Sequence, residues 1–223
     1  MSDRRPRYVA IIMDGNARWA AARGLGVTEG HRAGTDTLKR TVRLAGDFDI
    51  EQLTVYAFST ENWARPLSEV TGIMSLFVER IKTEAPELDD EGVRLRFVGR
   101  RDRVSEDAVR QMEWAEELTA RHSNRTLFVA FDYGGRAEIL HAAERYGAGG
   151  EEEFRAGLYA PDMLDPELII RTGGEMRLSN FLLWQAAYAE LYFSDLMWPD
   201  FDRAELERAL DSYAAREYRF GGR

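Results

Sequence analysis

Arginine and glycine occur together with other polar residues in two short segments, and each segment follows an apolar run. Asp14, Gly15, Asn16 and Arg18 come after the first run, and residues 171–179 hold two arginines, a diglycine and a serine. Arginine forks match phosphate oxygens, and glycine lets an anion approach the backbone. Both segments therefore suit a phosphate or diphosphate group. The alternatives are an ordinary Asp-Gly-Asn turn for the first segment and a structural salt-bridge network for the second.

Two carboxylates in these surroundings need partners. Asp14 could hold Mg2+ between the protein and a diphosphate, because Mg2+ takes oxygen ligands from one or two carboxylates and from phosphates. Glu190 stands in the apolar run 186–193, where an unpaired buried carboxylate would be costly. Either a metal ion or an arginine would serve as its partner.

A third polar segment, residues 59–66, holds Asn62, Trp63 and Arg65 after another apolar run. Binding residues concentrate in loops at strand ends. The alternative is that this segment caps the next helix, with Trp63 as a hydrophobic plug. His31 lies at the predicted start of a helix and could share a diphosphate oxygen, although a lone surface histidine is the simpler reading.

Short apolar runs that alternate with helical patterns would position these groups. The runs are nearly continuous in apolar residues, which is typical of parallel strands covered on both faces. We predict strands at residues 8–13, 53–58, 93–98, 127–131, 168–170 and 191–193. We predict helices at residues 31–45, 70–88, 105–119, 136–146, 180–188 and 203–215. Ser68 and Ser105 are expected N-caps, and the strand with Arg94 and Arg96 is expected at an edge.

The glycine-rich residues 147–153 look like a surface loop rather than a linker between domains. We therefore expect residues 1–223 to form one α/β domain, with a central, mostly parallel six-stranded sheet flanked by helices.

Composition excludes several classes of function. Thirty Lys and Arg against thirty-nine Asp and Glu give a net charge of −9, which disfavours binding to nucleic acid. Cysteine is absent, which excludes a thiolate metal site and fits a reducing compartment. Residues 8–13 and 181–193 are too short to span a membrane. These features predict a soluble, cytoplasmic protein.

The motifs taken together resemble one family over residues 8–222. They are MDGNARW (13–19), GH (30–31), YAFSTENWARP (56–66), YGGR (133–136), RTGGEMRLS (171–179), AELYF (189–193) and WPDF (198–201). This pattern resembles the cis-prenyltransferases, typified by bacterial undecaprenyl diphosphate synthase. The resemblance implies a homodimeric, Mg2+-dependent enzyme with a hydrophobic tunnel. It implies condensation of isopentenyl diphosphate with an allylic diphosphate, farnesyl or geranyl diphosphate, to give a Z-polyprenyl diphosphate.

The resemblance also implies roles for single residues. Asp14 matches the aspartate that organises Mg2+, and Glu190 matches a carboxylate that helps to bind the metal, across a dimer interface. Asp14 and Asn62 are the candidates for guiding the proton that is lost. Positions that hold the allylic diphosphate are matched by Gly15, Asn16, Arg18 and His31. Positions that hold isopentenyl diphosphate are matched by Arg171, Arg177 and Ser179. The mobile loop is matched by Asn62, Trp63 and Arg65, and the same motifs add Trp19, Ser59 and Glu61 as substrate-binding candidates. A C-terminal signature that reaches a neighbouring site is matched by Arg219 and Gly221.

One position departs from the family. Val27 stands where many members carry an arginine, which implies a weaker or altered allylic site unless Arg23 or Arg32 compensates. Ala57 is small, and residues 77–93 carry no insertion, which favours a medium-chain product such as undecaprenyl diphosphate over a short one. Such a product would allow transient peripheral membrane contact. A noncatalytic supporting subunit is disfavoured because the diphosphate ligands are present.

Overall fold

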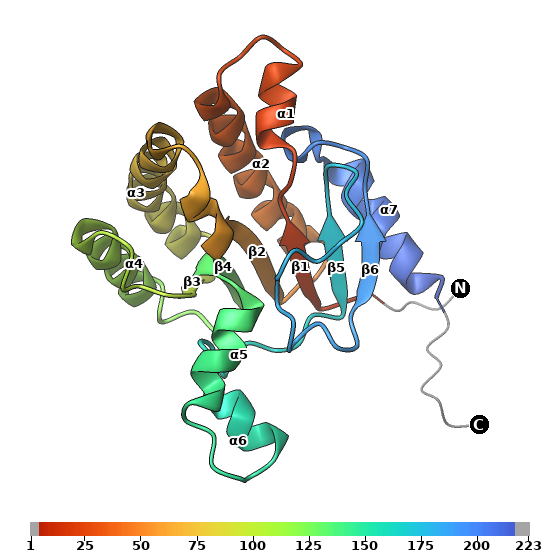
Figure 1. The fold of residues 1–223 in the computed structure, drawn as a ribbon. Coiled ribbons are helices and arrows are strands. Elements are labelled where there is room, and N and C mark those ends of the chain that lie inside the picture. Colours follow the sequence, from red (N-terminus) through yellow and green to blue (C-terminus); the bar gives the residue numbers. More distant parts are fainter. Residues whose placement is uncertain (1–4, 217–223) are drawn as a thin grey trace.

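Six parallel strands form the centre of the molecule (Figure 1). The structure, a computed structural model, describes residues 5–216. The strands are β1 (Tyr8–Ile12), β2 (Gln52–Ser59), β3 (Val93–Val98), β4 (Arg125–Tyr133), β5 (Leu168–Arg171) and β6 (Glu190–Phe193). Their order is β3-β4-β2-β1-β5-β6, and every pair is parallel. The predicted six-stranded sheet is confirmed, with β3, which carries Arg94 and Arg96, at an edge.

The sheet buries both of its faces, which explains why its strands read as continuous apolar runs. Alternate residues of β1 join two separate cores: Val9 and Ile11 belong to one, and Ala10 and Ile12 to the other. Side chains alternate across a strand, so a strand covered on both sides must be apolar at every position.

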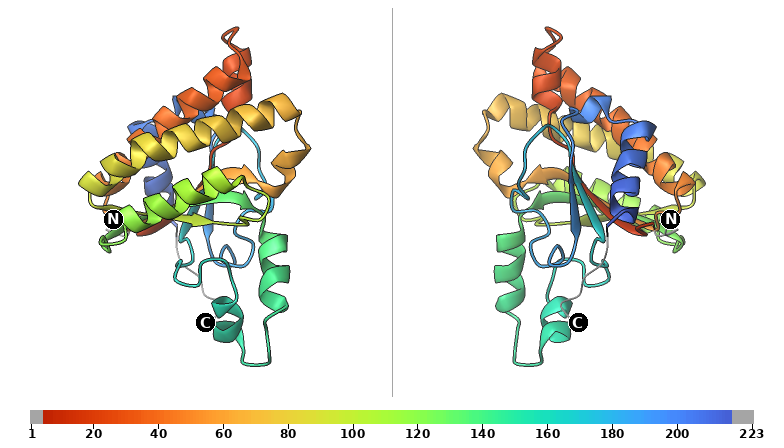
Figure 2. Two further views of the ribbon diagram at one scale, coloured as in Figure 1. Left: turned by 90° about the vertical axis from the view of Figure 1, so that its left-hand side faces the viewer. Right: turned by 90° about the vertical axis from the view of Figure 1, so that its right-hand side faces the viewer.

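Helices cover the first face. They include α2 (Val27–Asp47), α3 (Leu67–Asp90), α4 (Glu106–Leu118) and α7 (Arg203–Ala214), and each adds buried residues to the same core. The remaining helical elements are α1 (Asn16–Ala21), η1 (Thr60–Ala64), α5 (Gly135–Ala143), α6 (Glu151–Ala156) and η2 (Trp198–Asp200). Helices α2 and α3 run beside each other over the sheet, and α5 and α6 extend from the opposite end (Figure 2). The described part of the chain contains no helix long and apolar enough to cross a membrane.

The second face is covered largely by irregular chain, and one prediction fails there. The helix expected at residues 180–188 does not form, because Asn180 and Leu182 adopt left-handed φ values of 66° and 45°. The carbonyl of Asn180 accepts from Gly135 N at 2.7 Å, and its side chain accepts from Arg136 N at 2.8 Å. These tertiary bonds replace helical ones, while Phe181 and Leu182 are fully buried against the sheet.

The helix ends were predicted in part. Ser105 caps α4, since its Oγ accepts from Ala108 N at 3.3 Å. Ser68 is not a cap, because α3 already begins at Leu67, directly after Pro66. Pro66 is the N-cap, with φ −51° and ψ 138°. Proline suits the start of a helix because its missing N–H would have no helical partner there. The stretch 147–153, expected as a loop, contains the start of α6, and α1 was not predicted.

The two serines give a matched test of capping. Ser105→Ala removes the acceptor for Ala108 N, so we expect it to lower the free energy of unfolding by about 1 kcal/mol. Ser68 is exposed in the first turn of α3. Ser68→Ala should therefore change the free energy of unfolding by less than about 0.5 kcal/mol. Urea denaturation of both variants measures the difference, and equal effects would contradict the assignment.

Candidate active site

The two predicted anion-binding segments meet at the carboxyl ends of neighbouring strands. Ile12 of β1 pairs with Arg171 of β5, and Asp14 lies two residues beyond that pair. The Arg171 guanidinium donates to Asp14 Oδ2 at 2.9 Å, with only 4% of Arg171 exposed. Ligands bind at this edge of open α/β sheets. Asp14 and Arg171 therefore lie side by side at the edge of the sheet where a ligand would bind.

Backbone contacts hold Asp14 in place. The hydroxyl of Thr172 donates to Asp14 O at 2.8 Å and accepts from Asp14 N at 3.0 Å. Thr172 is fully buried. Because Thr172 directly follows Arg171, one segment fixes both the backbone and the charge of the aspartate.

Further cationic and hydroxyl groups surround this pair. Arg18 donates to Asp14 Oδ1 at 3.1 Å, so the carboxylate lies between two guanidinium groups. Arg171 also donates to Ser179 Oγ at 2.6 Å and to the carbonyl of Arg177. Asp14 thus faces Arg18 and Arg171, while Arg177 is ion-paired with Glu175. Two carboxylates offset only part of the positive charge of the three arginines, and an anionic phosphate group suits the remainder.

Glycine is required at two places where the chains approach closely. Gly15 has φ 111°, and a Cβ there would lie 2.7 Å from Met197 Sδ. Gly173 has φ 86°, and a Cβ there would lie 2.6 Å from an Arg18 guanidinium nitrogen. Both positions favour glycine by backbone conformation as well as by space.

A polar pocket of about 670 Å³ occupies this edge of the sheet. Most of the predicted site residues line it: Asp14, Gly15, Asn16, Arg18, His31, Ser59, Glu61, Asn62, Arg65, Arg171, Arg177 and Ser179. These residues come from four segments of the chain, which the sheet brings together. The pocket also has lining residues that we did not predict, among them Tyr56 and Asn180.

Several buried polar atoms here have no hydrogen-bond partner among the described residues. They are Asn16 Oδ1, His31 Nε2 and Arg171 Nε. Buried polar groups are normally hydrogen-bonded, and the exceptions often mark places for a ligand or water. Burial, with the nearby Arg65 guanidinium, lowers the pKa of His31, so the imidazole is neutral at neutral pH. Neutral imidazole can donate one hydrogen bond to a phosphate oxygen.

In the segment after β2, Asn62 lines the polar pocket, whereas Trp63 does not. Asn62 Oδ1 accepts from Ser59 N at 3.0 Å and helps to cap η1. Trp63 Nε1 donates to Asp132 Oδ1 at 2.8 Å, and its ring packs edge-on against Phe58. Trp63 does not line the pocket. In this conformation the residue matches the hydrophobic-plug alternative.

Other predicted residues lie elsewhere. Trp19 Nε1 donates to Asp200 at 2.7 Å, with Arg23 over its ring. Glu190 pairs with Leu168 at the amino ends of β5 and β6, opposite the end that carries Asp14. Its carboxylate forms an ion pair with Arg216, so within one chain its partner is an arginine. Arg219 and Gly221 lie outside the described residues.

Neither candidate for compensating Val27 reaches the pocket. Arg23 forms an ion pair with Asp200 at 3.2 Å, and Arg32 lies 3.8 Å from Glu79. Val27 itself is 38% exposed and lines a separate pocket of about 330 Å³ next to His31. Arg65, which lines the polar pocket, is the cation that lowers the pKa of His31.

The described residues contain no group of three metal-ligating side chains. Asp14 is the carboxylate that contacts Arg18 and Arg171. Glu175 is paired with Arg177, and Glu61 accepts from Asn180 at 2.9 Å. Mg2+ often binds through one or two carboxylates and completes its shell with phosphate oxygens and water. The donor set therefore suits a Mg2+ ion that arrives with a diphosphate, rather than a preformed metal cage.

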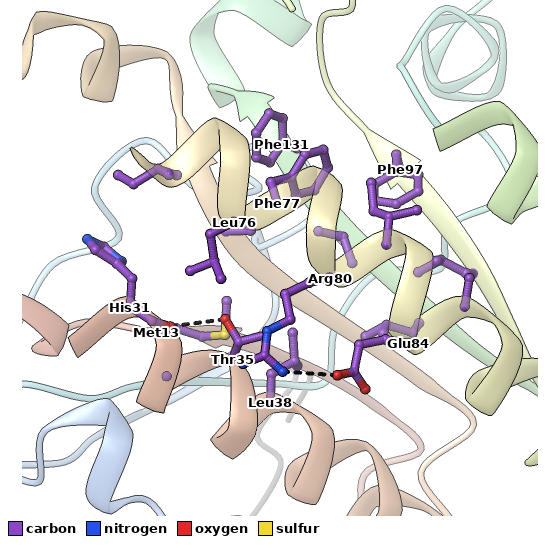
Figure 3. A pocket seen from close by; sticks show the side chains of 18 of the residues that line it. Met13, His31, Thr35, Leu38, Leu76, Phe77, Arg80, Glu84, Phe97 and Phe131 are labelled. Carbon is purple, nitrogen blue, oxygen red and sulfur yellow. Dashed lines mark hydrogen bonds and ion pairs between the residues drawn. The ribbon is translucent and has the colours of Figure 1, made fainter. Parts of the chain in front are cut away.

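An apolar cavity of about 160 Å³ opens from the polar pocket. Both are lined by the same five residues, Met13, Asn16, His31, Ala57 and Ile73. From there the cavity follows α3, whose lining residues run from Ile73 to Leu88 (Figure 3). The fifteen residue-to-residue steps from Ile73 to Leu88 correspond to about 22 Å of helix. A cationic pocket thus continues into a long apolar one.

Sequence reasoning missed Tyr56, Thr172 and Asn180. Thr172 stood inside a motif already singled out, between an arginine and a diglycine, and a hydroxyl there was a usable signal. Tyr56 is in a strand that we expected to be wholly buried, but its hydroxyl donates to Tyr133 O at 3.1 Å at the pocket edge. Asn180 was assigned to a helix, which hid its turn geometry.

Comparisons with known proteins agree with one another. A family model described as "Putative undecaprenyl diphosphate synthase" matches residues 12–221. An isoprenyl transferase of Thermotoga maritima is 50% identical, with 98% of each chain covered. Isoprenyl transferase 2 of Bradyrhizobium diazoefficiens is 50% identical over 97% of this chain and 90% of its own.

Solved structures show the same fold. Lavandulyl diphosphate synthase from Lavandula x intermedia, in complex with dimethylallyl diphosphate, has a TM-score of 0.93 and is 33% identical. The match covers 98% of this chain and 99% of that chain. A probable undecaprenyl diphosphate synthase from Campylobacter jejuni has a TM-score of 0.84 and is 31% identical, covering 98% and 100%.

The buried histidine of the pocket predicts a pH dependence of stability. The folded pKa of His31 is lower than its ordinary value of 6.5, so the unfolded chain takes up a proton first as the pH falls. Stability is then lost with a slope of up to about 1.4 kcal/mol per pH unit until the folded pKa is reached. His31→Gln should remove this loss. We would measure the free energy of unfolding of the unaltered protein and of His31→Gln across pH. The two values should converge as the pH falls, and a constant difference between them would contradict the prediction.

Proposed function

The chain belongs to the cis-prenyltransferase family, and we propose that it condenses isopentenyl diphosphate with an allylic diphosphate to make a Z-polyprenyl diphosphate. The allylic substrate is farnesyl or geranyl diphosphate. We take the catalytic domain to span residues 1–223.

One observation carries this proposal: the cationic pocket and the apolar cavity share a lining. A prenyl diphosphate has a dianionic or trianionic head and an apolar tail, and it would fill both parts at once. A sugar phosphate or a nucleotide would leave the apolar part empty. Ligand sites are mostly apolar, with a few polar groups that fix the orientation, and this arrangement follows that division.

The residues divide between two diphosphate groups. Gly15, Asn16, Arg18 and His31 lie around the mouth of the apolar cavity or next to it, which supports a role with the allylic diphosphate, whose tail must enter that cavity. A second diphosphate, that of isopentenyl diphosphate, is assigned to Arg171, Arg177 and Ser179. Asp14 lies between the two sets, within hydrogen-bond distance of Arg18 and Arg171.

The reaction needs charge stabilisation rather than a covalent intermediate. The C–O bond of the allylic diphosphate breaks, and pyrophosphate leaves with the electron pair. The isopentenyl double bond attacks the allylic carbon, and a proton lost from the adjacent carbon forms the new double bond. Arginines placed before the reaction begins stabilise the charge that develops on the departing pyrophosphate. Bound Mg2+, held by Asp14 together with substrate oxygens, would supply further positive charge to that leaving group.

Asp14 and Asn62 guide the proton in this proposal. Both line the pocket, and each is held by backbone contacts: Asp14 by Thr172, and Asn62 by Ser59 N. Fixed orientation of such groups is what proton transfer requires. Trp19 and Trp63 would have to move to touch substrate, and Arg65, Ser59 and Glu61 are placed to bind it.

Product length is proposed as medium, such as undecaprenyl diphosphate, because Ala57 leaves the cavity mouth open. A specific observation also supports a short product. The cavity volume of about 160 Å³ is below the roughly 300–1,000 Å³ of sites for drug-sized ligands. A long chain would therefore need the walls to move.

We further propose a homodimer in the cytoplasm with transient peripheral membrane contact. β6 is an edge strand whose four residues remain partly exposed, which supports an interface there. In a dimer, Glu190, Arg219 and Gly221 would act on the partner's site. The absence of cysteine suits a reducing compartment.

Removing the carboxylate of Asp14 tests the assigned chemistry. We expect Asp14→Asn to lower kcat by about 10²-fold or more, since charge stabilisation is lost at the leaving group. Asp14→Ala should do the same, and it also leaves buried Arg171 without its ion-pair partner, which destabilises the fold. Circular dichroism checks folding, and Asp107→Ala, exposed on α4, is the control. Full turnover of folded Asp14→Asn would overturn the assignment.

Sizing the products decides between the two lengths. Purified protein is incubated with Mg2+, labelled isopentenyl diphosphate and either geranyl or farnesyl diphosphate, and the extracted products are separated by chain length. Medium-chain products are expected. Accumulation of products one or two units longer than the primer would instead support the short-chain alternative, and no elongation from either primer would contradict the proposed function.

A further inference from the structure

The outer wall of the apolar cavity is a seam between α2 and α3 that is bridged by ion pairs. Cations at positions 32, 39 and 43 of α2, together with an acid at position 36, face a row of opposite charges on α3 and its end. The pairs are Arg32–Glu79 at 3.8 Å, Asp36–Arg80 at 3.0 Å, Lys39–Glu84 at 3.4 Å, Arg43–Glu87 at 3.4 Å and Arg43–Glu91 at 2.7 Å. Their spacing of three or four residues keeps them on one face of each helix. We call this row the α2–α3 seam.

The cavity lies directly under the seam. On its α3 side it is lined by large residues such as Leu76, Phe77 and Ile81, whereas Gly34, Thr35 and Leu38 line it on the α2 side. The residues that α2 buries are mostly small: Gly30, Gly34, Thr37, Thr41, Val42 and Ala45. Apolar packing across the seam is therefore thin.

Arg80 belongs to the α2–α3 seam and also lines the apolar cavity. Its side chain leaves α3 and reaches toward Thr35 and Leu38 of α2, with Glu84 beside it (Figure 3). The guanidinium contacts Asp36 at 3.0 Å and Glu84 at 3.2 Å, while Nε is buried with no partner. Both Arg80 and Glu84 line the apolar cavity. At this point charged side chains form part of the cavity wall between the two helices, beside Leu38 of α2.

Two helices joined by ion pairs separate more easily than two helices joined by apolar packing. Partly exposed ion pairs contribute little to stability, and salt screens them. Asp36 and Arg43 are each 53% exposed and already contact water. Arg80 and Glu84 are 21% and 19% exposed, and they gain water contacts when the helices separate. The wall between α3 and the sheet is harder to separate. There the ring of Phe77 stacks on that of Phe131, with 3.7 Å between the ring centroids, and both pack in the main core.

We propose that the α2–α3 seam is the expandable wall of the prenyl cavity, so that the strength of its ion pairs limits the length of chain the protein accommodates. The inference rests on the proposed function for the identity of the chain. Short tails fit beneath the closed seam. Longer tails displace Arg80 and separate Asp36 from it.

A cross-link across the seam tests this without requiring catalysis. The chain has no cysteine, so Asp36→Cys with Arg80→Cys can be joined by a short bismaleimide. The matched control joins Arg80→Cys to Glu84→Cys, four residues apart on α3, which removes the same arginine and leaves the seam free. Binding of geraniol, farnesol and geranylgeraniol is followed by tryptophan fluorescence, because Trp198 lines the cavity.

We expect the cross-seam link to weaken binding of geranylgeraniol at least 10-fold relative to the control link, with little change for geraniol. Equal affinities of both linked proteins for the longest alcohol would overturn the proposal. Equal affinities are expected if long prenyl tails instead leave the cavity past Leu88, at its far end.

Weakening the seam should have the opposite effect in the elongation assay. Asp36→Asn with Lys39→Gln removes pairs to Arg80, Glu84 and Glu87, and we expect its products to shift to greater length, as should those of the unaltered protein at raised salt. Glu106→Gln, which removes an exposed pair on α4, is the control. An unchanged distribution of product lengths would contradict the proposed role of the α2–α3 seam.

If the unaltered protein shows no elongation at all, the proposed function is contradicted instead. The alcohol-binding experiment would then still test the role of the seam.

Discussion

Arg171 carries a charge that the fold buries, and the partner of that charge organises the whole site. A buried guanidinium is costly unless a carboxylate and further acceptors surround it, and here Asp14, Ser179 and the carbonyl of Arg177 do so. Because Asp14 follows β1 and Arg171 ends β5, the pair also joins two neighbouring strand ends. Arg18 of α1 also contacts Asp14, and the carbonyl of Arg177 accepts from Arg171. The site and the centre of the sheet therefore depend on one another.

The same face of the sheet supports two environments of opposite character. At the strand ends, polar loops from β1, β2 and β5 make a cationic pocket. Farther along, α3 crosses over β2, β3 and β4 and leaves an apolar hollow beneath it. The boundary lies at Met13, Asn16, His31, Ala57 and Ile73, where burial leaves polar atoms of Asn16 and His31 without partners. Neutral His31 suits this boundary, because a charged imidazole would be costly next to apolar residues.

Local patterns identified most of the sheet and the long helices, and the exceptions have physical causes. The apolar residues of 180–188 could belong to a helix or to buried irregular chain, because a short apolar run does not distinguish them. Hydrogen bonds from Gly135 N and Arg136 N to Asn180 decide for irregular chain. Similarly, Pro66 starts α3 before Ser68 can cap it, and the glycines of residues 147–150 hid the acidic first turn of α6.

The amino-acid sequence by itself determined the class of fold and the edge where the chemistry lies. Continuous apolar strands require a parallel sheet covered on both faces, and parallel strands bring the residues that follow them to one edge. Asp14, Asn62 and Arg171 each follow a strand, and this rule assigns all three to that edge. Tertiary structure alone decided which groups touch. It turned Trp63 toward Asp132, paired Glu190 with Arg216 at the far end of the strands, and set a row of ion pairs over the apolar cavity. Such contacts join residues far apart in the chain, and they depend on strand register and helix packing, which no local pattern encodes.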